Sequence, residues 1–308
     1  MRRRDVLALL SGAALLPFAA RAQSSGLDPR LTPARPDLAA KSLEGRVPVA
    51  RYVEGRLQEI VVGQAGVRKA PAGDAELLTE ALAGERVTVY ELGEEGFAWG
   101  QLETDGYVGY VPVGALGPPG PPSTHRVTAL RTHMLPAPSV RRPPVASLPF
   151  GSRVAIARTE GDFAVTTSGG YVPVAHLAPV ETIESDPVAV AERFLGAPYL
   201  WGGKTGAGFD CSGLVQVVLN ACGIACPRDT DMQEKALGAP REAPSDPAAL
   251  RRGDLVFWRG HVALVRDAAT LLHANAHAMA VVVEPIAAAV GRIAETGGGA
   301  VTGVGRPG

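Results

Sequence analysis

Two segments of the chain repeat the same alternation of apolar and polar residues. The first covers 84–116 and the second 151–177. Each opens with Gly-x-Arg-Val, turns at a Glu-Gly pair shortly before a Phe, and closes with Tyr-Val-Pro-Val and a Leu. Short runs with a period of two, broken by Gly, Asp and Pro, are typical of small β-barrels. The repeat therefore predicts two such barrels, at 48–117 and 124–179, separated by the stiff linker "GPPGPPS".

After the second repeat the pattern changes to helical spacing followed by strands. Apolar residues at steps of three and four predict a short helix at 187–194 and another at 211–221, which Gly223 ends. The glycine-rich stretch between them, "YLWGGKTGAGFD", is predicted to be a loop. Helices followed by a run of strands predict an α+β domain, which we place at 186–308. Its strand-like runs are 254–258, 261–265, 270–274 and 280–285.

The first 47 residues lie outside this organisation. Three arginines, an apolar stretch and the sequence Ala-Arg-Ala predict a cleaved export signal at 1–22, with a twin-arginine character. Neither this stretch nor any later one is long and apolar enough for a stable membrane span. Residues 23–47 are polar and contain proline, and we expect an arm that lies on the rest of the protein. The signal predicts a periplasmic or secreted protein; the alternative is a cytoplasmic protein with a misassigned start.

The composition limits the classes of partner and site. The 308 residues include 30 Lys and Arg against 31 Asp and Glu, without a long basic run, so we do not expect nucleic acid as a partner. The three cysteines cannot all form structural disulfides, and no Cys or His spacing is that of a zinc site. Cys222 and Cys226 are interpreted as packing thiols, although they could pair in an oxidising compartment.

Cys211 stands at the start of the predicted helix, between Asp210 and Ser212. The unpaired N–H groups and the dipole of a helix N-terminus favour an anion, so this position favours the reactive thiolate. The flanking glycines allow a substrate to approach the backbone closely. The alternative is a small apolar core residue, because cysteine is often buried.

A nucleophilic cysteine requires a base, and two histidines fit that role. His261 opens one predicted strand and His273 lies twelve residues later in the next. If these strands form a hairpin whose turn has an odd number of residues, both rings point to one face, opposite one another. His273 could then orient His261 as the third member of a triad does, with His277 as the second choice.

Four motifs in this part of the chain resemble those of a known family. "PYLWGGKTGAGFDCSGLVQ", "PRDTDMQ", "GDLVFW" and "HVALV" resemble motifs of the NlpC/P60 family of papain-like cysteine peptidases, with "HVALV" in place of the commoner His-Val-Gly-Ile. The two repeats resemble bacterial SH3 domains. The resemblance implies a papain-like α+β domain behind two SH3-like barrels. It also implies that Cys211 is the nucleophile, His261 the general base and acid, and His273 the orienting residue.

SH3 modules joined to such a domain resemble γ-D-glutamyl-L-diamino acid endopeptidases of the cell wall. These enzymes cut peptidoglycan stem peptides between D-Glu and the diamino acid, and many require a free N-terminal L-Ala. The resemblance implies a closing role for Tyr107, for which a barrel-surface aromatic is the alternative, and a substrate contact for Asp229, for which a helix cap is the alternative. The remaining implied substrate residues are Asp210 for the amine, Ser212 with its hydroxyl, and Tyr199 and Trp201 in the pocket wall.

In this interpretation Cys211 attacks the γ-carbonyl of D-Glu after His261 removes the thiol proton, and backbone N–H groups at the helix start hold the oxyanion. No metal or cofactor is required. One alternative is an amidase or acyltransferase that uses the same three residues. The other is a peptidoglycan-binding protein without activity, although an intact Cys-His-His set argues against it.

Overall fold

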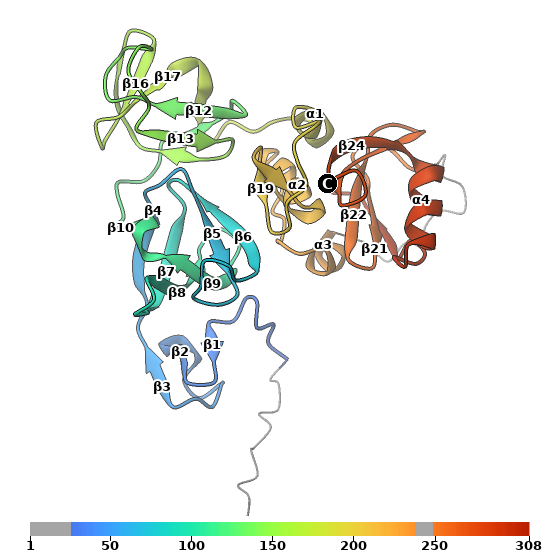
Figure 1. Ribbon diagram of the computed structural model, residues 1–308, viewed down its shortest axis with the longest axis horizontal. Coiled ribbons are helices and arrows are strands. Elements are labelled where there is room, and N and C mark those ends of the chain that lie inside the picture. The colour runs from blue at the N-terminus through green and yellow to red at the C-terminus, as the bar shows by residue number, and fades with distance from the viewer. Residues whose placement is uncertain (1–25, 238–248, 308) are drawn as a thin grey trace, which may run out of the picture.

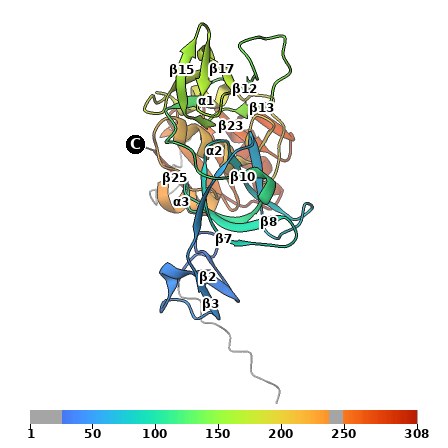
Figure 2. The same cartoon turned by 90° about the vertical axis from the view of Figure 1, so that its left-hand side faces the viewer.

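The computed structural model describes residues 26–237 and 249–307, and the predicted export signal lies outside them. An N-terminal arm and two β-rich units form a stack, and a mixed α/β domain lies beside it (Figure 1). Helix α2 (Cys211–Ala221) and strand β19 (Lys204–Thr205) are the parts of that domain nearest the stack. Figure 2 shows the stack from its own side, with the arm at one end and the second β-rich unit at the other.

The arm forms a three-stranded sheet of its own. Its elements are β1 (Ala34–Arg35), β2 (Leu38–Ala40), η1 (Lys41–Leu43) and β3 (Arg51–Val53). β3 runs parallel to β2 and pairs with it rather than with the first β-rich unit. The first barrel was expected to begin at residue 48, but this pairing assigns 51–53 to the arm. Polar composition alone gave no signal for a strand pairing that spans the expected boundary.

The first β-rich unit is one seven-stranded sheet in the order β10-β4-β7-β8-β9-β5-β6. The predicted alternation is confirmed in β7, where Val87 and Val89 are buried and the residues on either side are partly exposed. The buried residues meet those of β8 and β9 in one apolar core. The elements are β4 (Arg56–Ile60), β5 (Gln64–Arg68), β6 (Leu77–Leu82), β7 (Arg86–Leu92), β8 (Phe97–Leu102), β9 (Val108–Pro112), η2 (Val113–Ala115) and β10 (Leu116–Gly117).

The second β-rich unit is built from three small sheets, β14-β11-β18, β12-β13 and β15-β16-β17. Val127, Leu148, Val154 and Val172 form its core, and Ala83 from the first unit joins them. This shared core explains why the two units are stacked end to end. The elements are β11 (His125–Val127), β12 (Arg131–Met134), β13 (Ala146–Pro149), β14 (Arg153–Val154), β15 (Ile156–Glu160), β16 (Phe163–Thr166), β17 (Tyr171–Pro173), η3 (Val174–His176) and β18 (Leu177–Pro179).

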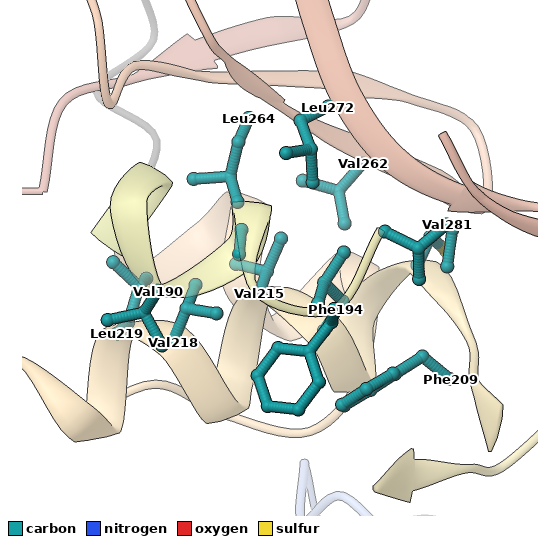
Figure 3. Packing of buried hydrophobic residues seen from close by; sticks show 14 of the residues in the cluster. Val190, Phe194, Phe209, Val215, Val218, Leu219, Val262, Leu264, Leu272 and Val281 are labelled. Atoms are coloured by element: carbon teal, nitrogen blue, oxygen red, sulfur yellow. The ribbon is translucent and has the colours of Figure 1, made fainter. Parts of the chain in front are cut away.

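The α/β domain is a five-stranded antiparallel sheet with a helix on each face. The sheet order is β24-β23-β22-β21-β25. Helix α2 packs on one face through residues such as Val215 and Val218, as Figure 3 shows, and α4 covers the other through Ala289 and Ile293. The elements are α1 (Pro187–Glu192), β20 (Gly208–Phe209), α3 (Thr230–Leu237), β21 (Leu255–Trp258), β22 (His261–Val265), β23 (Thr270–Asn275), β24 (Ala280–Pro285), α4 (Ile286–Glu295) and β25 (Gly303–Gly305).

The predicted helix at 211–221 and the predicted strands at 261–265 and 280–285 are confirmed to the residue. The sequence analysis missed α3, α4 and β25, and the glycine-rich stretch predicted as a loop contains the short hairpin β19-β20. No helix among the described residues is long and apolar enough to cross a bilayer.

The first β-rich unit and the α/β domain meet through buried charges. The backbone N–H of Lys204 donates to Glu80 at 2.8 Å, and its ammonium group lies 3.4 Å from the carboxylate of Glu85. All three residues are buried. A buried charge is costly unless it keeps its partner, so these contacts hold the two parts in one orientation.

Gly202 tests how closely these parts pack. Its φ is +76°, and a Cβ there would lie 2.5 Å from the carbonyl oxygen of Leu77 on β6, whereas Gly196 has a φ of +82° and no atom within 4 Å of a Cβ. Both alanine variants suffer the left-handed backbone, about 1–2 kcal/mol. We expect Gly202→Ala to lower the free energy of unfolding by about 1–3 kcal/mol more than Gly196→Ala, because only it forces the packed surfaces apart. Urea titration of the two variants measures the difference, and equal losses would contradict the packing described here.

Candidate active site

A pocket of about 550 Å³ opens where the arm, the first β-rich unit and the α/β domain meet. The arm supplies Pro29 and Arg30, and the β-rich unit supplies Lys69 and Glu76 among others. The structure brings most of the predicted site residues to this pocket. Those that line it are Tyr107, Tyr199, Trp201, Asp210, Cys211, Ser212 and Asp229.

Cys211 is placed by the N-terminus of α2. Asp210 is the N-cap residue, and its side chain accepts a hydrogen bond from the backbone N–H of Gly213 at 2.6 Å. The buried sulfur lies 3.8 Å from Oγ1 of Thr230 and near the backbone N–H of Val262. Because Val262 directly follows His261, the sulfur lies at the start of the strand that carries the predicted base.

The environment of Cys211 corrects the expectation of a resting thiolate. Burial raises the pKa of the thiol to about 11, and the negative charge of Asp210 also opposes ionisation. Contacts from Val262, Thr230 and the helix N-terminus lower the pKa without offsetting these two causes. This environment favours the neutral thiol, so a base would have to remove its proton before the sulfur could act as a nucleophile.

The two predicted histidines are in contact. Nε2 of His261 lies 2.9 Å from Nδ1 of His273, so Nδ1 of His261 is the nitrogen left for another partner. Burial lowers the pKa of His261 to about 3 and that of His273 to about 4, so both rings are neutral at neutral pH. A neutral His261 is the protonation state that a general base needs.

The hairpin register explains how the rings meet. β22 and β23 pair Leu264 with Leu272 and Val265 with Leu271, and continuing this register sets Ala263 opposite His273. The prediction that both histidines share one face is confirmed by their contact. The prediction that they lie directly opposite one another is wrong: they are diagonal neighbours, two residues apart in register, because the hairpin is centred on residue 268 and direct opposition would need residue 267. Imidazole rings can still meet at that offset.

The far side of His273 is also occupied. Its Nε2 lies 3.1 Å from Oε2 of Glu284 and 2.9 Å from Nδ2 of Asn275. Arg292 on α4 donates to both oxygens of Glu284, at 3.0 and 2.6 Å. The guanidinium lowers the pKa of Glu284 and keeps it ionised. The residue that contacts His261 is therefore His273, the first choice for the orienting role, and not His277, the second choice.

Asp210 does not present a free carboxylate to the pocket. Arg228 donates to both of its oxygens, at 3.0 and 2.7 Å, and the backbone N–H groups of Gly202 and Gly213 donate as well. Ser212 accepts from Arg228 at 2.8 Å. The expectation that Asp210 binds a substrate amine is therefore not supported, because its charge is already matched by a buried guanidinium.

Asp229 is the carboxylate that reaches the pocket from the same segment. The hydroxyl of Tyr107 donates to its Oδ2 at 2.9 Å, and Arg30 of the arm donates to the same oxygen at 2.9 Å. Arg30 also contacts Asp231 and Asp28. Tyr107 is 3 % exposed, which argues against a barrel-surface aromatic. The carboxylate of Asp229 contacts Tyr107 and Arg30. Its side chain therefore does not act as the helix cap that was considered as the alternative.

Tyr199 and Trp201 form the pocket wall next to the nucleophile. Burial raises the pKa of Tyr199 to about 12. Trp201 is 60 % exposed and lies beside Glu76, which also pairs with Lys69 at 2.7 Å. The wall therefore combines an aromatic surface with acidic groups.

Sequence analysis missed Arg228, Arg30 and Glu284. Arg228 lies in the "PRDTDMQ" run, so its place next to Asp229 was visible, but its partner Asp210 lies 18 residues away in the sequence.

Cys222 and Cys226 are free thiols. Across 26–237 and 249–307, no group of three or more His, Cys, Asp or Glu side chains is arranged to hold a metal ion.

Two family models match the chain. Residues 196–290 match the NlpC/P60 family, and residues 67–116 match the bacterial dipeptidyl-peptidase Sh3 domain. The second match covers the first β-rich unit from the end of β5 to the first residue of β10. The second β-rich unit lies outside both matches.

Relatives and a solved structure are similar over different lengths. A γ-D-glutamyl-L-lysine dipeptidyl-peptidase of Bacillus subtilis is 38 % identical over 33 % of this chain and 35 % of its own length. One of Bacillus cereus is 31 % identical over 36 % of this chain and 29 % of its own length. The chain thus matches about a third of each relative. The crystal structure of an NlpC/P60 family protein from Bacillus cereus has a TM-score of 0.66 at 20 % identity, covering 82 % of this chain and 99 % of that one, which shows a shared fold.

The neutral state of Cys211 predicts a pH dependence of its alkylation. Because the thiolate is the reactive form and the pKa is raised to about 11, we expect the rate with iodoacetamide to rise about tenfold per pH unit between roughly pH 6.5 and 9.5. Mass spectrometry of the peptide that contains Cys211 measures the rate, in a Cys222→Ser background because Cys222 is half-buried. A rate that becomes constant near neutral pH would indicate a resting thiolate instead.

Proposed function

Because the chain carries an NlpC/P60 domain joined to a bacterial dipeptidyl-peptidase SH3 domain, we propose that it is a cysteine peptidase of the cell wall. One observation carries the proposal. Cys211 lies at a helix N-terminus beside the strand that carries His261, whose ring contacts His273, and Cys211 lines a pocket. A nucleophile, a base and a group that orients the base are the parts that acyl transfer requires.

The reaction follows from the protonation states. Nδ1 of His261 takes the proton of the Cys211 thiol while the sulfur attacks the substrate carbonyl, so two neutral groups become an ion pair only as the new bond forms. The backbone N–H of Cys211, in the first helical turn, is placed to stabilise the oxyanion. His261 then gives the proton to the leaving amine. Water, deprotonated by the same ring, releases the acyl group from sulfur.

The charge of the pocket supports a substrate with a free amine. Asp229, Asp231 and Glu76 line the pocket as carboxylates, against Arg30 and Lys69. A protonated α-amine next to Asp229 would gain a charge-assisted hydrogen bond. We propose that the free L-Ala amine of a stem peptide binds at Asp229 and Tyr107. Arg30 and Tyr107 both donate to Oδ2 of Asp229, which leaves Oδ1 for the amine, whereas Arg228 donates to both oxygens of Asp210.

The names of the relatives support a proposal about which bond is cut. Two of them are named γ-D-glutamyl-L-lysine dipeptidyl-peptidases. A dipeptidyl-peptidase releases two residues from a free end, which agrees with a pocket lined by the arm and the first β-rich unit. We therefore propose hydrolysis of the γ-D-Glu–diamino acid bond of peptidoglycan stem peptides.

The second β-rich unit is proposed to be a second SH3-like module. In both units a strand ending in Val-Pro leads into a short 3-10 helix, at β9-η2 and at β17-η3. That strand pairs with the preceding one in each case, β8 with β9 and β16 with β17. Together with the predicted export signal, this organisation favours action on the wall or on released stem peptides outside the inner membrane.

A synthetic substrate tests the function directly. We expect L-Ala-γ-D-Glu-diaminopimelate to give the dipeptide L-Ala-D-Glu, and we expect N-acetylation of the L-Ala to reduce kcat/KM at least tenfold, because it removes the charge that meets Asp229. Mass spectrometry of the products measures both rates.

Cys211→Ala is the control for residual activity. Equal rates on the free and acetylated peptides would contradict amine recognition. Release of a different fragment would indicate an amidase or acyltransferase, and a folded protein without any product would indicate a binding protein.

Tyr107→Phe separates substrate binding from chemistry. The variant keeps the ring but loses the hydrogen bond to Asp229, so we expect KM for the free-amine peptide to rise about tenfold, as for the loss of one hydrogen bond to a charged group, with kcat nearly constant. Tyr110→Phe is the matched control, because its hydroxyl accepts from Arg35 in the arm and Tyr110 lies outside the pocket lining. Unchanged KM in Tyr107→Phe would remove the first β-rich unit from the amine site.

A further inference from the structure

We propose that Glu284 is a positioning residue that sets the tautomer of His273 and, through it, the tautomer of His261. The proposal rests on the proposed function, in which His261 is the base. It assigns a role to a carboxylate that does not touch the substrate pocket and that the sequence analysis did not identify.

The geometry forms a continuous chain from helix α4 to the nucleophile's strand. Arg292 donates to both oxygens of Glu284. Oε2 of Glu284 lies 3.1 Å from Nε2 of His273. On the other side of that ring, Nδ1 of His273 lies 2.9 Å from Nε2 of His261. The side chain of His273 is fully buried, so neighbouring groups rather than water satisfy its nitrogens. The charged and titratable groups that act on it are Glu284 of β24, Arg292 of α4 and His261 of β22.

Only one tautomer of His273 leaves His261 able to accept a proton. A neutral imidazole has one N–H and one lone pair. If the proton of His273 is on Nε2, its Nδ1 accepts from Nε2–H of His261, and Nδ1 of His261 keeps a lone pair for the thiol proton. If the proton is on Nδ1, it is donated to Nε2 of His261, whose own proton must then lie on Nδ1. In that state the nitrogen left for the nucleophile is a donor and cannot act as a base.

Two side chains compete for Nε2 of His273. Asn275 is oriented by its Oδ1, which accepts from the backbone N–H of Ala278 at 2.7 Å, and this points its amide N–H toward the imidazole at 2.9 Å. A donor there favours the inactive tautomer. The carboxylate of Glu284 accepts only, and hydrogen bonds to an ionised group are roughly twice as strong as neutral ones. Because Arg292 keeps Glu284 ionised, the carboxylate prevails and the proton stays on Nε2.

Glu284→Gln is the decisive variant. It preserves the shape but removes the charge that decides the competition, and the amide that replaces the carboxylate can offer Arg292 only one oxygen. We expect kcat on the free-amine stem peptide to fall about 10²-fold or more, in the range of a lost general base, with KM changed less than about threefold. Glu295→Gln, an exposed change at the end of α4, the helix that carries Arg292, is the control for altered surface charge.

A second substitution tests the mechanism by rescue. Adding Asn275→Asp to Glu284→Gln places a carboxylate next to Nε2 of His273 again, now from position 275 instead of position 284. We expect the double variant to recover at least tenfold of the lost kcat. A purely structural role for Glu284 predicts no recovery, because the second substitution does not restore the contact with Arg292.

The tautomer itself can be measured without any substrate. Two-bond ¹H–¹⁵N correlation spectra of the imidazole groups, assigned by loss of signals in His273→Gln, show which nitrogen carries the proton. We expect Nε2 in the unsubstituted protein and Nδ1 in Glu284→Gln. A proton on Nδ1 of His273 in the unsubstituted protein would overturn the proposal even if Glu284→Gln did not fold. Because this spectrum needs no turnover, a failure of the proposed peptidase activity is distinguished from a failure of this inference.

Discussion

The ion pair between Asp210 and Arg228 is the contact on which the site depends. Both residues are buried, and the guanidinium is 1 % exposed. The same carboxylate caps helix α2, accepts a hydrogen bond from the backbone N–H of Gly202, which follows Trp201 of the pocket wall, and lies next to Cys211. Leaving either charge unpaired at this depth costs about 3–5 kcal/mol. The pair therefore couples the start of the helix, the wall and the sulfur into one arrangement.

That pair also links the α/β domain to the first β-rich unit. Nε of Arg228 donates to the hydroxyl of Thr79 on β6 at 2.9 Å, and Gln216 of α2 donates to Asp105 at 2.9 Å. Tyr107, on the same side of the β-rich unit, reaches Asp229, the residue after Arg228. The unit is consequently part of the site rather than only a tether, because the hydrogen bonds that orient Arg228 and Asp229 extend into it. The arm acts in the same way through Arg30.

The sequence predicted the parts of this site whose signal is local. Helix α2 follows from the three- and four-residue spacing of its apolar residues, and strands β22 and β24 follow from short apolar runs. The pairing of His261 with His273 follows from two strands and a turn. Arg228 with Asp210 and Arg30 with Asp229 could not be predicted, because no local pattern pairs them and they meet only after folding. Glu284 lies only eleven residues from His273 and reaches it across the β23-β24 pairing, so it was missed although its signal is local. Helix α4 was not predicted because it follows β24 directly, with Pro285 as its N-cap residue and no side-chain cap to mark its start.

Burial explains why the site needs a long hydrogen-bonded chain behind its base. A helix N-terminus favours a thiolate when water can reach it, but here burial and Asp210 raise the pKa of Cys211 while burial lowers that of His261. The proposed reaction would therefore create an imidazolium in a poorly solvated place, where an uncompensated charge is most costly. Glu284 lies two hydrogen bonds away, but the positive charge of Arg292, which holds it, opposes protonation of His261 at least as strongly as Glu284 favours it. The hydrogen-bonded chain therefore contributes orientation rather than a net negative charge, because groups that are aligned before the reaction add nothing to its barrier by having to reorient.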